Sequence, residues 1–131
     1  MSAPKRVQRR RTKGWRAPAG AVHVSRGTKW GNPWAVVSCG RHGPFDLERD
    51  GAFIGQYTSR QLCATRAVEL FRDAVERGRE WYGVPTVETI RAELAGKDLV
   101  CWCPLTDEHG NRVPCHVDVL LELANTEGVT P

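Results

Sequence analysis

Four residues near the end of the chain carry side chains that bind metals or act as nucleophiles. Cys101 and Cys103 flank a tryptophan, and Cys115 is followed directly by His116. Three cysteine sulfurs and one imidazole can together form the ligand set of a structural zinc site, although zinc is more often held by cysteine pairs with wider spacing. His109, between the two pairs, is the alternative nitrogen ligand. These residue types therefore predict a zinc site.

The same cluster admits two other interpretations. Cys115 lies where a helix is expected to start, and the helix dipole at that point favours the thiolate. His116 or His23 could then move a proton, which would make Cys115 and His116 catalytic residues. In the third interpretation, Cys101 and Cys103 are only small apolar side chains in a packed strand. The residues alone do not decide between metal binding, catalysis and packing.

A second group of polar residues lies in a glycine-rich loop in the first third of the chain. Its two glycines permit tight turns and close approach of the backbone to a ligand. Its N–H groups and two cations favour an anion, and its indole could stack on a base. The glycine spacing matches neither a P-loop nor a dinucleotide fingerprint, and a tight turn over a tryptophan core is an equal alternative. The expected ligand-binding residues are Arg26, Gly27, Thr28, Lys29, Trp30, Gly31 and Asn32.

Positive charge is concentrated at the beginning of the chain. The 131 residues have a formal net charge of +4, but residues 1–14 contain six cationic side chains and no acid. The remaining 13 cationic residues stand against 15 acidic ones, so the rest of the chain is slightly acidic. We therefore expect residues 1–20 to form a basic, disordered leader. Residues 1–14 of this leader could contact nucleic acid weakly through its phosphates.

Nothing in the sequence points to a membrane or to secretion. No apolar run is long enough to cross a bilayer, and no apolar segment follows the basic beginning as it does in a signal peptide. The five cysteines, an odd number, do not indicate a disulfide framework. We expect a cytoplasmic protein that does not bind membranes, and the sequence leaves its oligomeric state open.

Hydrophobic periodicity predicts the elements that must position these residues. The expected strands are 21–25, 34–37 and 99–103, and the expected helices are 58–77, 86–95 and 115–124. Residues 38–57 are expected to form a long connection with one short strand near 52–54. The order strand-strand-helix-helix-strand-helix indicates a small α/β sandwich with at least one parallel crossover. We expect a single domain over 21–125 and a frayed tail at 126–131.

Two blocks of the sequence, 22–34 and 99–124, together resemble the domain of unknown function 4326 family of phages and bacteria. The first block matches at Gly27, Thr28, Trp30, Gly31, Asn32 and Pro33. The second matches at Cys101, Trp102, Cys103, Pro114, Cys115 and His116, and also at Asp118, Leu120 and Leu121. The resemblance implies that the two blocks form one site, and it implies no particular reaction. The connection from Cys103 to Pro114 is longer than is typical of this family.

These observations favour a protein that binds or processes a nucleotide or a related phosphate-bearing small molecule, with Zn²⁺ as its expected cofactor. The alternative is a nucleic-acid-binding module with a zinc-stabilised fold and a basic N-terminal arm. A third possibility is an interaction protein that uses Trp81 and Tyr82 as anchors. Whether the protein is an enzyme stays open at this level.

Overall fold

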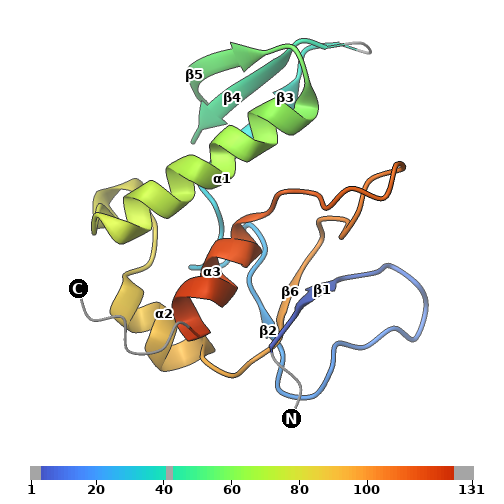
Figure 1. The fold of residues 1–131 in the computed structure, drawn as a ribbon, viewed down its shortest axis with the longest axis vertical. Coiled ribbons are helices and arrows are strands. Elements are labelled where there is room, and N and C mark those ends of the chain that lie inside the picture. Colours follow the sequence, from blue (N-terminus) through green and yellow to red (C-terminus); the bar gives the residue numbers. More distant parts are fainter. Residues whose placement is uncertain (1–3, 41–42, 126–131) are drawn as a thin grey trace.

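The computed structural model describes residues 4–40 and 43–125, which contain two small β-sheets and three α-helices (Figure 1). The parallel sheet has the order β1-β6-β2 and is formed by Arg6–Gln8, Leu99–Cys101 and Val22–His23. The antiparallel sheet has the order β3-β4-β5 and is formed by Trp34–Ser38, Phe45–Arg49 and Ala52–Tyr57. The helices are α1 Arg60–Glu76, α2 Val87–Leu94 and α3 His116–Asn125, with a short 3-10 helix at Glu80–Tyr82. The predicted α/β class is confirmed.

Strand β6 is the centre of the parallel sheet, and all three of its residues are buried. It pairs with β1 on one side and β2 on the other, so both edges of its backbone are hydrogen-bonded. A strand in this position needs apolar side chains on both faces, which Leu99 and Val100 provide. The strand ends at Cys101, and the cysteine cluster therefore begins at the carboxyl edge of a rigid strand.

The helices form where local signals predict them. The hydroxyl of Ser59 accepts a hydrogen bond from the N–H of Leu62 and caps α1, and Thr86 caps α2 in the same way. Helix α1 packs against both β3 and α3, so it lies between the antiparallel sheet and the rest of the chain (Figure 1). None of the helices in the described part of the chain is both long and apolar enough to cross a membrane.

The expected disordered leader is wrong for residues 6–8, because these residues form β1. Leu99 donates its N–H to the carbonyl of Lys5, and Arg9 donates its N–H to the carbonyl of Cys101. The central strand β6 would leave one edge unpaired without β1, and pairing that edge satisfies its backbone groups. Residues 1–3 of the leader and the predicted tail at 126–131 lie outside the described residues.

The expected long connection over 38–57 is also wrong in large part, because β4 and β5 form a hairpin there. Two residues, Asp50 and Gly51, connect the paired residues Arg49 and Ala52, and both have positive φ angles, 52° and 87°. An Asp-Gly pair is the typical sequence of such a two-residue turn. The signal for the turn was therefore present in the sequence, but three of the five residues of β4 are charged, which hid that strand.

Candidate functional site

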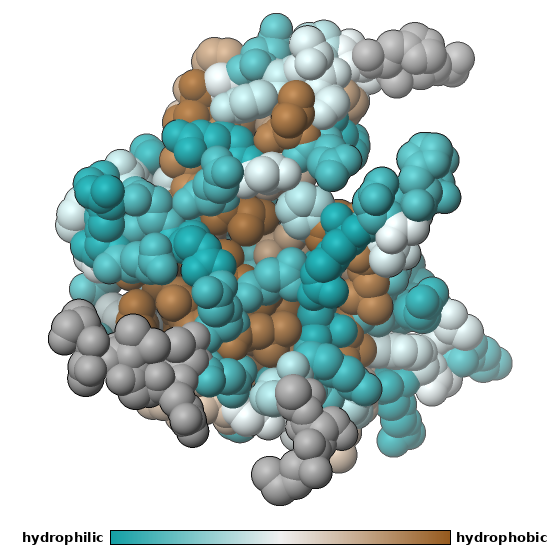
Figure 2. Space-filling view, viewed as in Figure 1, coloured by the Kyte–Doolittle hydropathy of each residue, from teal (hydrophilic) through white to brown (hydrophobic). Residues whose placement is uncertain are grey.

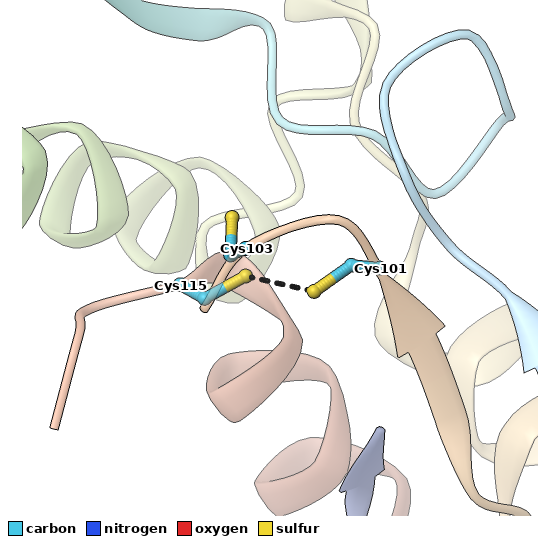
Figure 3. Close-up of side chains that lie close together, drawn as sticks. All are labelled: Cys101, Cys103 and Cys115. Atoms are coloured by element: carbon cyan, nitrogen blue, oxygen red, sulfur yellow. Dashed lines mark hydrogen bonds between the residues drawn. The ribbon is translucent and has the colours of Figure 1, made fainter. Parts of the chain in front are cut away.

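The three cysteines predicted to act together do lie together. The sulfur atoms of Cys101, Cys103 and Cys115 all lie within 4.8 Å of one another, and those of Cys101 and Cys115 are 3.6 Å apart (Figure 3). Cys101 ends β6, Cys103 follows two residues later, and Cys115 directly precedes α3. Cys101 and Cys115 are buried and Cys103 is partly exposed. The expected strand 99–103 ends at Cys101, so a bend in the chain places Cys103 near Cys101, and the fold brings Cys115 to both.

An ordered loop between Cys103 and Cys115 returns the chain to the cluster. Thr106 pairs with Arg112 in an isolated β-bridge, and Val113 donates its N–H to the carbonyl of Leu105. Asp107 stabilises the tip, where its carboxylate accepts hydrogen bonds from the N–H groups of Asn111 and His109. These hydrogen bonds, with that of Asn111 as the largest contribution, lower the pKa of Asp107. The loop is therefore a small hairpin rather than an unstructured insertion.

Arg6 fastens both ends of this loop to the domain. Its side chain is only 1% exposed, and its guanidinium donates to the carbonyls of Val113 at 2.8 Å and Pro104 at 2.6 Å. It also forms an ion pair with Asp118 of α3, at 3.0 Å. The sequence placed Arg6 in the leader, because one more cation in a basic run carries no signal of burial. Arg6 is a positioning residue of the site that sequence reasoning missed.

The cluster holds negative charge on one of its sulfurs. Hydrogen bonds from the thiols of Cys101 and then Cys115 lower the pKa of Cys103 to about 2. The hydrogen bond with Cys103 raises the pKa of Cys101, and contacts with Cys101 and Cys103 raise that of Cys115. Cys103 is therefore a thiolate that two neighbouring thiols stabilise. Thiolate is the form of cysteine that binds metal and attacks electrophiles.

His116 lies beside Cys115. Its Nδ1 is 3.7 Å from the sulfur of Cys115, and its Nε2 is 2.8 Å from the carbonyl oxygen of Val24. Burial lowers the pKa of His116, so the ring is neutral near pH 7. Because a carbonyl only accepts, Nε2 carries the proton and Nδ1 keeps a lone pair near Cys115. The alternative ligand His109 lies on the exposed tip of the loop, beside Glu108.

The two sequence blocks face each other across one cavity of about 660 Å³. Arg26 and Asn32 line it from the glycine-rich loop, and Cys103, Cys115 and His116 line it from the cluster. The remaining walls come from β3, from the first half of α1 and from the loop after β6. The space-filling view shows a recess between that loop and the antiparallel sheet, with hydrophobic residues at its base (Figure 2). The site thus unites residues far apart in the sequence.

Five of the seven expected ligand-binding residues do not line this cavity. The indole of Trp30 is buried in the core, and Lys29 lies over it and pairs with Glu93 at 2.8 Å. Thr28 closes a local turn, in which its hydroxyl donates to the carbonyl of Ser25. Gly27 has a φ of 94°, and Gly31 donates its N–H to the carbonyl of Thr28 in the same turn. For these residues, the predicted alternative of a tight turn over a tryptophan core describes the structure.

Asn32 connects the glycine-rich loop to α1. Its buried amide donates to the carbonyl of Ala67 at 3.1 Å, and its carbonyl accepts the N–H of Trp34 at 2.9 Å. Arg26 donates to the carbonyls of Asn32 and Trp34. Both acceptors of Arg26 are neutral, so its positive charge is not compensated by a carboxylate in these contacts.

Two further cations line the cavity and were missed from the sequence. The guanidinium of Arg60 lies over the ring of Phe45, 5.1 Å from its centre. Arg112 donates to the carboxylate of Asp118 at 2.5 Å. Among the residues that line this cavity there are three arginines and one carboxylate, that of Asp107. No local pattern in the sequence connects these side chains, since each comes from a different element.

A protein-family model, the domain of unknown function DUF4326, matches residues 7–126 of the chain. The match begins inside β1, so it includes two of the three residues of the strand that the sequence had assigned to a leader. No curated protein and no solved structure matches the chain.

Proposed function

The chain belongs to the domain of unknown function 4326 family, and from this premise we propose that it binds a phosphate-bearing small molecule, such as a nucleotide, beside a zinc ion. The zinc ligands are Cys101, Cys103, Cys115 and the Nδ1 of His116. The observation that carries the proposal is the cavity itself, which has the thiolate cluster and three guanidinium groups on its walls.

The spacing of the ligand atoms supports a tetrahedral metal site. Zinc–sulfur bonds of about 2.3 Å in a tetrahedron place neighbouring sulfurs about 3.8 Å apart. The distances of 3.6 Å between the sulfurs of Cys101 and Cys115, and 3.7 Å from Cys115 to His116 Nδ1, are close to this value. The bond from His116 Nε2 to the carbonyl of Val24 is the arrangement that usually orients a metal-binding histidine. The three mutually close sulfurs therefore fit zinc, and His116 is proposed as the fourth ligand from its contact with Cys115.

The cavity supports an anionic ligand of nucleotide size. Its volume of about 660 Å³ lies within the range of small-molecule pockets. Arg60 and Arg112 can donate to phosphate oxygens, and Arg26 adds a third positive charge to the same space. Ala35 and Val36 of β3 offer an apolar wall for the rest of the ligand. In this proposal the chain binds and orients the ligand. Zinc held by four side chains would have no open position, so when bound it would join the end of β6 to the start of α3 and stabilise the wall of the cavity.

The metal is tested by elemental analysis of the purified protein. We expect close to one zinc per chain, lost when Cys103 or Cys101 is changed to Ser. Cys39→Ser is the matched control, because Cys39 is an exposed cysteine outside the cluster, and it should leave the zinc content unchanged. Equal zinc in all variants, or no metal in the unaltered protein, would contradict the metal site.

The ligand is tested by calorimetric titration with adenosine monophosphate, ribose 5-phosphate and adenosine. We expect the two phosphate compounds to bind and adenosine to bind much more weakly. Arg60→Gln should weaken phosphate binding about tenfold, since one charge-assisted hydrogen bond is lost at a partly solvated site. Arg77→Gln removes a similar exposed cation at the far end of α1, where Arg77 pairs with Asp73, and serves as the control. Equal effects of both variants, or no binding by any of the three compounds, would overturn the proposal.

A further inference from the structure

The segment from Lys5 to Arg16, called here the basic arm, is held against the edge of the parallel sheet. It begins as β1, and Arg9 continues the pairing by donating its N–H to the carbonyl of Cys101 at 2.6 Å. A turn follows, in which Trp15 donates its N–H to the carbonyl of Thr12. The cations of the arm are therefore presented from a defined place in the fold, next to β6.

Charge is distributed very unevenly along the chain. Residues 1–45 contain ten of the nineteen Lys and Arg residues and no Asp or Glu. Later residues contain nine cations and all fifteen acids. Within the described part of the chain, the arm's side chains form one ion pair with a carboxylate, that of the buried Arg6 with Asp118. The arm's other cations, Lys5, Arg9, Arg10, Arg11, Lys13 and Arg16, are thus available to an anionic partner.

Trp102 gives this charged surface an aromatic platform. The guanidinium carbons of Arg9 and Arg11 lie 4.5 and 4.7 Å from the centre of its ring. The ring is 39% exposed, although its neighbour Cys101 is buried. The chain bends directly after β6, so the indole lies at the surface next to the end of that strand. An exposed indole beside two arginines is a surface on which unpaired bases stack.

We propose that the basic arm and Trp102 bind single-stranded nucleic acid. The cations contact successive phosphates, and a base stacks on the indole or on a guanidinium plane beside it. A single strand fits better than a duplex because only an unpaired base can offer its face to Trp102. No residue of the arm and no atom of Trp102 lines the cavity described above, so this site does not depend on the function proposed there.

The test measures the anisotropy of fluorescein-labelled oligothymidylate and oligouridylate with the full chain, at KCl concentrations from about 50 to about 200 mM. Six available cations predict a slope of log affinity against log salt of roughly −4. Arg9→Gln with Arg11→Gln should reduce the steepness to roughly −3. Arg66→Gln with Arg77→Gln is the control, because it removes the same charge from exposed ion pairs on α1 and should leave binding unchanged.

The stacking step is tested separately at Trp102. Trp102→Ala should weaken binding by about 5- to 150-fold, and Trp102→Phe should recover most of this loss. Circular dichroism checks that each variant is folded. If Trp102→Ala does not fold, the variant with Arg9→Gln and Arg11→Gln still tests the proposal. The proposal is overturned by equal losses in the arm and control pairs, or by affinity that does not respond to Trp102→Ala in a folded protein. It is also overturned by tighter binding to phosphatidylserine vesicles or to duplex DNA than to the single strands.

Discussion

Replacing Arg6 with methionine should destabilise the loop that positions the cysteine cluster. Methionine fills a similar volume but donates no hydrogen bonds. The carbonyls of Pro104 and Val113 then lose their guanidinium donors, and Asp118 loses one of its two arginine partners. Because the two carbonyls flank the loop between Cys103 and Cys115, both ends of that loop lose their attachment to the domain.

The expected cost is about 3 kcal/mol of the free energy of unfolding. Breaking a buried charged pair by removing one partner typically costs about 3–5 kcal/mol. Asp118 is 32% exposed and keeps Arg112, which reduces its share of the loss. Arg6 also has a buried Nε without a hydrogen-bond partner in the described structure, and methionine removes that penalty. These two corrections place the cost at the lower end of the range.

Urea denaturation followed by circular dichroism measures this cost. With a slope of about 1–3 kcal/mol per molar urea, a loss of about 3 kcal/mol lowers the midpoint by about 1–3 M. Arg10→Met removes an exposed cation of the same basic run and should change the stability by less than about 0.5 kcal/mol. If the two variants have the same midpoint, Arg6 is not a structural residue and the account of the loop given above is refuted.

Two further predictions follow from the cluster and from the glycine-rich loop. In metal-free protein, Cys103 should react with iodoacetamide at a nearly constant rate from about pH 8 down to about pH 5, because its lowered pKa keeps it a thiolate. The rate at Cys39, whose pKa is raised by a hydrogen bond with Asp46, should fall steeply over the same range. Peptide mass spectrometry measures the alkylation of both cysteines. Parallel pH profiles would contradict the assignment of Cys103 as the thiolate. Asn32→Ala should cost about 2 kcal/mol, because it leaves the buried N–H of Trp34 without its acceptor. Asn32→Asp keeps that acceptor but buries a charge, so it should also be less stable than the unaltered protein. If both variants have the urea midpoint of the unaltered protein, the contacts of Asn32 do not stabilise the fold.

The helices and the spacing of the first two cysteines were predictable because they depend on local physics. Ser59 and Thr86 cap helices through hydrogen bonds to residues three positions ahead, and the apolar stripe of α1 follows the helical repeat. The closeness of the thiols of Cys101 and Cys103 is confirmed, although the expected strand 99–103 is wrong beyond Cys101, because the chain bends before Cys103. Each of these features depends on residues only a few positions apart.

The errors concern features that depend on distant partners. Arg6 and β1 look like part of a disordered leader until β6 offers an unpaired edge and three acceptors surround the guanidinium. The β4–β5 hairpin is a partial exception, since Asp50 and Gly51 carried a local signal for its turn. Burial of a cation depends on the acceptors around it, and these come from residues about a hundred positions away.

The sequence by itself determined which residue types could do chemistry, and the family resemblance indicated that the two blocks belong together. Only the tertiary structure decided what each residue faces. It placed Arg26 and Asn32 on the cavity and Trp30 in the core, although all three lie in one short loop. It also joined Arg60 and Arg112 to the same cavity, from elements with no common pattern. The physical reason is that helix caps, turns and the periodicity of apolar residues depend on neighbours along the chain. A cavity is formed by packing between elements that are distant in the sequence.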